Sequence, residues 1–446
     1  MLAYEMKGSS VEVLADIPKH WGIGKVKNGF YLKPSNVDKK SHDDEIVVEL
    51  CNYVDVYYND FIVNELPFME ATAKQTEIDK FSLQIDDVII TKDSEDPMDI
   101  GVPALVKENK PSLVCGYHLT MLKKRLNNVS GAFLFWALKD SAIASQLYRE
   151  ATGVTRWAIS SRNIKNVSIP YPPFDEQKSI ADYLDKACEK IDKTLSIKQQ
   201  QLDKLEAYRK SIIHEAVTKG LDKNVPMTDS GVEWLGKVNA SWKVVKLKRV
   251  LAEKLKYGAN ESAELDDTSL PRYIRITDFG NDGKLKANTF KSLKEETAKP
   301  YMLKQGDVLF ARSGATVGKT FQFKNYNGKA CFAGYLIKAT VSSAKMTSDF
   351  LYYYTKSTAY SNWKDIIFTQ ATIQNIGADK YQYLDITQPP IEDQEAIADY
   401  LDKACEKIDK TKAVIELQIT KLTQYRQSLI HECVTGKKRV YQGDIY

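Results

Sequence analysis

The sequence predicts an α+β fold in which two globular domains alternate with two long helices, paired as an antiparallel coiled coil with pseudo-two-fold symmetry. Three observations lead to this fold class. Residues 180–194 return letter for letter at 397–411. Weaker similarities precede both copies. Each copy also places an apolar residue at every third or fourth position, which is typical of a helix that packs along its length.

The strong repeat is a duplicated segment, because aligning 176–218 with 393–435 gives 27 identities in 43 positions without a gap. A chain with two similar halves can adopt within itself the symmetry of a homodimer. Shorter similarities connect the segments before each copy, namely 10–21 with 230–242, 87–90 with 307–310, 115–117 with 334–335, and 155–159 with 372–376.

The repeats divide the 446 residues into four segments. Each half is long enough to bury a core of its own. The segments are a first globular domain at 1–172, a first helix at 173–220, a second globular domain at 221–388, and a second helix with a C-terminal tail at 389–446.

Composition argues against several classes of protein. The sequence has no run of 18 apolar residues, and its amino terminus lacks the pattern of a secretion signal. The six cysteines form no CxxC pattern, which favours reduced thiols in the cytoplasm over disulfides or zinc. Because the net charge is only +4, any surface for nucleic acid must be a local patch.

Each repeated segment is expected to form one helix. Proline pairs at 172–173 and 389–390 precede the helices, acidic residues fill the first turns, and Gly220 and Gly436 end them. Roughly 43 residues at about 1.5 Å each predict rods of about 65 Å, which act as a spacer. The alternative is that each helix folds back on its own domain. The residues expected to pair the helices are Ile180, Leu184, Ile191, Leu202, Leu205, Ile212, Ile397, Leu401, Ile408, Ile415, Ile419, Leu422 and Leu429.

The globular domains carry short segments of both kinds. Residues 242–257 form a basic amphipathic segment, for which contact with phosphate and an ordinary solvated helix face are both open. Helices are expected at 132–145 and 348–360. Strands rich in β-branched and aromatic residues are expected at 87–91, 307–311, 320–323 and 335–340.

Three strings resemble catalytic motifs but lack essential parts. The run 314–320 (GATVGKT) has three residues between its glycines where a phosphate-binding loop needs four, and a strand pattern follows it. The runs at 171–174 and 388–391 begin with Tyr and Gln, whereas the methyltransferase tetrapeptide begins with Asn, Asp or Ser. The His-Glu pairs at 214–215 and 431–432 have no second histidine at metal-binding spacing. An enzyme is therefore not indicated.

Several motifs nevertheless resemble one family. These are DSGVEWLGK at 229–237 followed by Trp242, GDVLF at 306–310, and the Pro-Pro-x-x-(Glu/Asp)-Gln-x-x-Ile-Ala run at 172–181 and 389–398. Together with the order of domains and helices, they resemble the specificity subunit of type I restriction–modification systems over essentially the whole chain. The similar module of fused restriction enzymes is a near neighbour.

The resemblance implies a function and a set of partners. Two target recognition domains would each read one half of a bipartite sequence in double-stranded DNA. The helices would hold them at a fixed spacing and dock two modification subunits, which restriction subunits join. The specificity subunit itself would be non-catalytic and without cofactor, while S-adenosylmethionine, magnesium and ATP are expected on the partners. The competing class is a scaffold with two protein-binding domains and no nucleic acid.

Residues that contact DNA are expected in polar loops that follow strands, where arginine can bond guanine and glutamine can bond adenine. For each of them, the alternative is an ordinary polar group on the surface. The candidates are Lys92, Asp93, Arg156 and Trp157 in the first domain, and Arg312, Ser313, Thr316, Lys319, Gln370 and Thr372 in the second.

Overall fold

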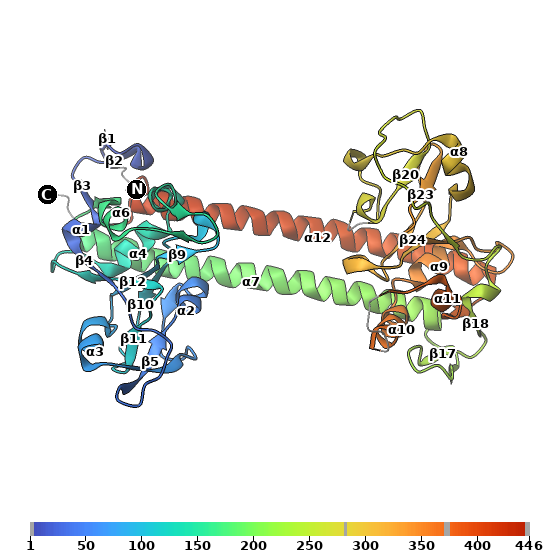
Figure 1. Ribbon diagram of the computed structural model, residues 1–446, viewed down its shortest axis with the longest axis horizontal. Coiled ribbons are helices and arrows are strands. Elements are labelled where there is room, and N and C mark those ends of the chain that lie inside the picture. The colour runs from blue at the N-terminus through green and yellow to red at the C-terminus, as the bar shows by residue number, and fades with distance from the viewer. Residues whose placement is uncertain (1–3, 281–282, 370–374, 442–446) are drawn as a thin grey trace. The chain divides into compact units, whose positions relative to one another are not determined.

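The computed structural model describes residues 4–280, 283–369 and 375–441, which fold into two compact units (Figure 1). Unit 1 comprises Met1–Lys198 and Leu417–Tyr446, and unit 2 comprises Gln199–Glu416. The two long helices, α7 (Phe174–Lys219) and α12 (Ile391–Val434), therefore contribute one end to each unit. Each globular domain is completed by a helix end from the other half of the sequence.

A five-stranded sheet forms the centre of unit 1. Its order is β4-β12-β8-β10-β6, antiparallel except for the parallel pair of β10 with β6. Two three-stranded sheets, β11-β5-β7 and β13-β14-β9, and two two-stranded sheets, β1-β2 and β15-β3, complete the β-structure of unit 1. The strands are β1 Met6–Gly8, β2 Asp16–Pro18, β3 Gly22–Lys25, β4 Phe30–Pro34, β5 Ile46–Cys51, β6 Phe61–Ile62, β7 Met69–Ala73, β8 Val88–Thr91, β9 Asp93–Ser94, β10 Pro103–Val106, β11 Leu113–Cys115, β12 Leu119–Lys124, β13 Thr152–Gly153, β14 Trp157–Ala158 and β15 Ser168–Tyr171.

Unit 2 repeats this plan with fewer strands. Its central sheet has the order β19-β24-β21-β22, and the parallel pair β20 with β23 corresponds to β5 with β11. No described strand of unit 2 takes the place of β6, so β22 is the edge of its sheet. The strands are β16 Met227–Asp229, β17 Lys237–Asn239, β18 Lys243–Lys246, β19 Lys256–Tyr257, β20 Arg272–Ile274, β21 Val308–Ala311, β22 Thr320–Gln322, β23 Ala330–Phe332, β24 Leu336–Ala339 and β25 Asp385–Gln388.

Short helices pack on these sheets, and two of the expected ones are each split in two. The predicted helix at 132–145 is divided at Asp140, whose carboxylate accepts a hydrogen bond from the Ile143 N–H and caps a new helix. The predicted helix at 348–360 is divided in the same way at Ser357, whose hydroxyl accepts from the Tyr360 N–H. The short helices are α1 Val26–Gly29, α2 Tyr53–Tyr58, α3 Gln75–Phe81, α4 Gly131–Lys139, α5 Ser141–Tyr148, α6 Ser161–Asn166, α8 Glu295–Ala298, α9 Ser348–Tyr354, α10 Thr358–Thr369 and α11 Ala378–Tyr381.

The basic segment at 242–257 is not a helix. It forms β18, a short 3-10 turn and β19. Two of its lysines are held by the protein, since Lys246 pairs with Asp385 at 2.8 Å and Lys248 lies 4.1 Å from the ring centre of Tyr383. The mixture of lysine and apolar residues in this segment also fits a helical pattern, but pairing with β25 makes residues 243–246 a strand.

The ends of the long helices follow the sequence signals. Gly220 and Gly436 adopt positive φ angles of 91° and 72°, which only glycine adopts without strain. Each glycine also makes room for a tryptophan. A Cβ on Gly220 would lie 3.1 Å from Trp242, and one on Gly436 would lie 3.0 Å from Trp21. The two tryptophans of the weaker repeat therefore pack on the helix end that completes their own unit.

The long helices run in opposite directions. In unit 2, Lys412 of α12 donates to Glu206 of α7 at 2.8 Å, and Arg209 of α7 pairs with Asp409 of α12. A step forward along α7 is thus a step backward along α12, which is the antiparallel coiled coil predicted from the sequence.

Unit 1 repeats this contact with the roles of the helices exchanged. Arg426 of α12 forms a two-pronged ion pair with Asp192 of α7, with distances of 2.9 and 3.1 Å. These residues lie 217 positions from Arg209 and Asp409 respectively. Because each helix plays both parts, the pairing has the pseudo-two-fold symmetry of a homodimer.

A buried glutamine near the start of α7 fixes where that helix meets its domain. The side-chain amide of Gln177 accepts a hydrogen bond from the Ser130 N–H at 2.9 Å and donates to the Pro172 carbonyl at 2.9 Å. It is 3 % exposed, so water cannot replace either partner.

Gln394 does the same at the start of α12. It accepts from the Thr347 N–H at 2.8 Å and donates to the Pro389 carbonyl at 2.8 Å, and it is fully buried. The glutamine in the repeated Pro-Pro motif therefore joins each long helix to its preceding domain.

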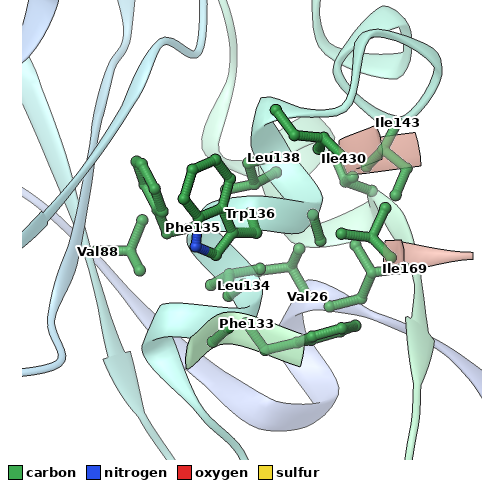
Figure 2. Close-up of a cluster of buried hydrophobic side chains, with 14 of the residues drawn as sticks. Val26, Val88, Phe133, Leu134, Phe135, Trp136, Leu138, Ile143, Ile169 and Ile430 are labelled. Carbon is green, nitrogen blue, oxygen red and sulfur yellow. The ribbon is translucent and has the colours of Figure 1, made fainter. Parts of the chain in front are cut away.

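The core of unit 1 draws on both long helices. Figure 2 shows Ile430 of α12 among the side chains of α4, including Trp136 and Leu138, and beside Ile143 of α5. Buried aliphatic side chains stabilise a fold by about 1.5–3 kcal/mol each, so this helix end is an integral part of the domain.

Replacing Gln177 or Gln394 by leucine should destabilise the unit that contains it by roughly 2 kcal/mol or more. The reason is that a buried N–H and a buried carbonyl each lose their partner, at about 1–3 kcal/mol per group. Urea unfolding followed by circular dichroism measures the loss. The exposed Gln199→Leu on α7 is the control and should change stability by no more than about 0.5 kcal/mol. Equal effects at positions 177 and 199 would contradict the role of the buried amides.

Candidate nucleic-acid interface

The four candidates of the first domain lie together at the end of β8. This strand ends at Thr91, and the next residues continue into β9, which pairs with β14 so that Trp157 lies opposite Ser94 and Ala158 opposite Asp93. The pairing brings Lys92 and Asp93 beside Arg156 and Trp157, although more than 60 residues separate them in sequence.

Asp93 organises the polar side chains of this surface. Its carboxylate accepts from Arg156 at 2.5 and 3.1 Å and lies 2.9 Å from Nδ1 of His118. The side chain of Arg156 is 55 % exposed, whereas that of Asp93 is 13 % exposed. The more buried carboxylate of Asp93 thus orients the guanidinium of Arg156, which keeps free donors toward solvent. This arrangement suits a base or phosphate contact.

Lys92 is less free than the sequence suggested. Its ammonium donates to the Ser35 carbonyl at 3.2 Å and lies 4.6 Å from the ring centre of Tyr117. Burial lowers the pKa of Lys92 from its ordinary value. It therefore supports the surface from inside and presents only part of its charge outward.

Unit 2 holds Arg312 in the same backbone frame as Lys92, that is, by the same two main-chain hydrogen bonds. The Lys92 N–H donates to the His118 carbonyl, and its own carbonyl accepts from the Ile159 N–H. The corresponding bonds of Arg312 run to Tyr335 and Ile376 at 3.0 and 2.8 Å.

This correspondence also shifts the sequence alignment of the following turn by one residue. Leu119 and Leu336 occupy equivalent places, opposite Thr91 and Ala311 in their sheets. His118 therefore corresponds to Tyr335, whereas the shared Gly-Tyr string had matched Tyr117 with Tyr335.

The guanidinium of Arg312 is positioned but not fully bonded. It lies 5.0 Å from the ring centre of Tyr257 and donates to the Gly334 carbonyl at 3.5 Å. Its Nε is buried and has no hydrogen-bond partner among the described residues. Gly334 and Tyr335 also line a neighbouring pocket of about 250 Å³. An arginine that stacks on an aromatic ring beside a pocket is well placed to donate to the edge of a base.

Three of the remaining candidates of unit 2 follow this arginine closely in sequence. Ser313 forms a β-bridge with Asn375, and Thr316 ends a short 3-10 turn whose carbonyl accepts from the Lys319 N–H. Lys319 is exposed just before β22. This turn is the GATVGKT string, and a strand follows it as expected. Gln370 and Thr372 lie outside the described residues.

Sequence reasoning missed the aromatic and histidine partners of these cations. Tyr117, His118 and Tyr257 stand beside Lys92, Asp93 and Arg312. Tyr117 was visible only as part of a repeated Gly-Tyr string, and Tyr257 only as the last residue of the basic segment. Their contacts come from strand pairing between distant segments, which spacing in sequence does not reveal.

The residues expected to pair the helices fall into two cores. Ile180, Leu184, Ile191 and Leu429 belong to the core of unit 1, and Ile212, Ile397, Leu401 and Ile408 belong to that of unit 2, with Leu205 packed against it. Ile415 is buried as well, whereas Leu202, Ile419 and Leu422 are partly exposed.

Other apolar residues of the long helices remain exposed, and two such positions are exposed in both copies of the repeat. Tyr208 and Tyr425 are 56 % and 52 % exposed, and Ile197 and Val414 are 46 % and 55 % exposed. Each pair is 217 positions apart. An apolar side chain left exposed at both copies of a repeat indicates a contact surface that the two copies share.

Two further findings concern the described residues only. None of their helices is both long and apolar enough to cross a membrane. They also contain no group of three His, Cys, Asp or Glu side chains arranged to hold a metal ion.

Two known proteins are similar to this chain in sequence over most of its length. A Methanocaldococcus jannaschii protein, provisionally named the specificity subunit of the type I restriction enzyme MjaX, is 23 % identical over 434 residues and covers 96 % of both chains. The MjaVIII specificity subunit of the same organism is 25 % identical over 335 residues, or 72 % of this chain and 74 % of that one.

Solved structures share the fold. A chain from a study of complex assembly and conformational transition of the type I restriction–modification system matches with a TM-score of 0.70 at 17 % identity, over 94 % of this chain and 98 % of that one. The HsdS subunit from Thermoanaerobacter tengcongensis matches with a TM-score of 0.51 at 18 % identity, over 95 % and 98 %.

The profile of the type I restriction modification DNA specificity domain matches twice, at residues 24–207 and 239–421. Each match spans one globular domain and most of the long helix that follows it, as the repeats had indicated. The chain therefore belongs to the family of type I restriction–modification specificity subunits.

Proposed function

We propose that this chain recognises a bipartite sequence in double-stranded DNA and recruits modification and restriction subunits to it. Residues 1–172 and 221–388 are the two recognition domains. The first helix lies in 173–220, the second helix and a C-terminal tail lie in 389–446, and the two helices are the spacer. The chain has no catalytic role. Methylation with S-adenosylmethionine, and cleavage with magnesium and ATP, belong to the partners, and the complex acts in the cytoplasm where host DNA lies.

One observation carries this proposal. Lys92 and Arg312 occupy the same backbone frame at the end of the central strand of their units, each beside an aromatic ring. Phosphate and base recognition both require cations that are held rigidly at a surface. Two equivalent cations with different neighbours suit a protein that reads two different half-sites with one fold.

A scaffold without nucleic acid is the other candidate, and the site does not favour it. The cores of protein-binding surfaces are depleted of lysine. The strand end of unit 2 instead presents Lys319 to solvent, and that of unit 1 presents Arg156, which suits a base or phosphate contact. Exposed apolar side chains also occur on the long helices, where partner subunits are proposed to bind.

DNA binding by the chain with its modification subunits tests the proposal. The isolated chain should bind weakly and lose binding as salt rises, whereas the complex should bind its methylated sequence tightly. Arg312→Ala should lower the preference for the correct base at one position of one half-site by about 1–3 kcal/mol. Fluorescence anisotropy with duplexes varied at each position measures the preference, and the exposed Lys345→Ala serves as the control. Absence of DNA binding by the complex at every salt concentration would refute the function.

The long helices are proposed to set the spacing between the half-sites. Four residues inserted into each helix, after Lys198 and after Glu416, add about 6 Å to a helical rod, or roughly two base pairs of DNA. The sequence methylated by the complex should gain a spacer longer by one or two base pairs. Sequencing of methylated adenines in a host that carries the variant reads this directly. Four substitutions at the same places are the control, and an unchanged spacer with the insertions would exclude the helices as the ruler.

The exposed apolar pairs on the helices are proposed to dock two copies of one modification subunit. Tyr208→Glu and Tyr425→Glu should each remove one copy, because a buried unpaired carboxylate costs several kcal/mol at an interface. The double variant should bind none. Native mass spectrometry of the purified complex counts the copies, with Gln200→Glu on the same helix as the control. Retention of two copies by the double variant would place the docking surface elsewhere.

A further inference from the structure

The two units differ in charge at one equivalent place beside the long helices. In unit 1, Asp60 receives two cations, Lys139 of α4 and Arg426 of α12, the latter at 3.0 Å. Arg426 also pairs with Asp192. The two cations are therefore balanced by two carboxylates, and this group of four side chains has no net charge.

Unit 2 keeps the cations but not the bridging carboxylate. Arg209 and Lys356 stand 217 positions from Arg426 and Lys139, and Arg209 pairs with Asp409 as expected. Lys356 instead donates to the Thr320 carbonyl at 2.6 Å. Among the described residues, no carboxylate forms an ion pair with Lys356. The ammonium also lies 4.7 Å from the ring centre of Tyr352, but it has no counterpart of Asp60 among the described residues.

Two further cations gather at this place in unit 2. A Cβ on Gly318 would overlap the side chain of Lys364, and in unit 1 a Cβ on the equivalent Gly101 would overlap the side chain of Leu147. The apolar neighbour of unit 1 is thus a lysine in unit 2. The next residue, exposed Lys319, follows Gly318 directly.

The cations influence one another. Burial, together with the nearby charges of Arg209 and Lys319, lowers the pKa of Lys356 to about 8. A buried amine without a counter-ion is costly for a folded protein. The ammonium would be stabilised by an anion that approached it from solvent.

Among its described residues, the sheet of unit 2 lacks the strand beside which Asp60 lies in unit 1. In unit 1, β6 covers the edge of β10, and Asp60 lies immediately before β6. In unit 2, the strand that corresponds to β10 is β22, and it is the edge of its sheet. The first residue of β22 is Thr320, whose carbonyl accepts the hydrogen bond from Lys356. The side chain of Arg209 is 30 % exposed, so an external group can reach the cations.

We propose that Lys319, Lys356, Lys364 and Arg209 bind a phosphate of the DNA backbone, and that unit 1 has no such site. This inference rests on the proposed function. A DNA phosphate fits better than a carboxylate of a protein partner because the Lys319 N–H donates to the Thr316 carbonyl and so ties Lys319 to the turn at 314–316, close to Arg312 in sequence. Unit 2 would then anchor its half of the duplex by charge, whereas unit 1 depends more on its base contacts.

The test measures DNA binding by the full chain with its modification subunits at several KCl concentrations. The double variant Lys319→Gln/Lys356→Gln should reduce the slope of log affinity against log salt by about 0.9, because its complex would neutralise one phosphate fewer. Affinity should fall alike for specific and unrelated duplexes. The exposed single variant Lys319→Gln gives the same readout if the double variant melts at a lower temperature. The matched control is Lys139→Gln in unit 1, which should leave the slope unchanged because Asp60 already holds that cation.

The outcomes separate this inference from the proposed function. Normal binding by the wild-type complex with an unchanged slope for both unit 2 variants would overturn the phosphate site and leave the function intact. An equal reduction of the slope for Lys139→Gln would overturn the difference between the units. A variant that keeps the slope but loses a modification subunit would assign the cations to a protein carboxylate. If the wild-type complex binds no DNA, the function fails before any variant is compared.

Discussion

The largest core of each unit is completed by a helix end from the other half of the sequence, and the rest of the structure follows from that constraint. Unit 1 is completed by Leu429, Ile430, Cys433 and Val434 at the end of α12. Unit 2 is completed in the same way by the last turns of α7, including Val217. Because each domain needs the helix end of the other half, the helices must run antiparallel. The repeated sequence is alike in the two halves because it has to fit two positions at once: beside its own domain and at the end of the other.

Much of this architecture could be predicted from the sequence, because the repeat, the proline pairs and the terminal glycines act locally. The splits at Asp140 and Ser357 could not, since a capping side chain and an ordinary polar residue inside a helix look alike in sequence. The strand at 243–246 was hidden because its pairing partner lies about 140 residues away. The grouping of Asp93 with Arg156 was anticipated only as a common place at strand ends, and His118 was missed because its contact depends on the fold.

The candidate site shows how recognition can diverge while the fold stays constant. The frame around Lys92 and Arg312 consists of backbone hydrogen bonds, which do not depend on the side chains they carry. Asp93 in one unit and Ser313 in the other can therefore differ without cost to the sheet. The independence of the fold from these side chains also explains why the charges around Lys356 could change, while the equivalent Lys139 of unit 1 is paired with Asp60. Main-chain hydrogen bonds and buried helix ends keep the fold of the two units alike. The side chains at the strand ends differ between the units.

The completion of unit 1 by residues after 416 has a consequence for biosynthesis. A ribosome releases the first domain more than 200 residues before the helix end that fills its core. During that interval α4 and its neighbours have an unfilled apolar surface, which other nascent chains or chaperones can occupy. Unit 1 thus completes its core only after the end of α12 has been synthesised, and a frameshift or early stop before Leu429 also leaves the core of the first domain unfilled. A single gene in this form delivers two reading domains together or neither.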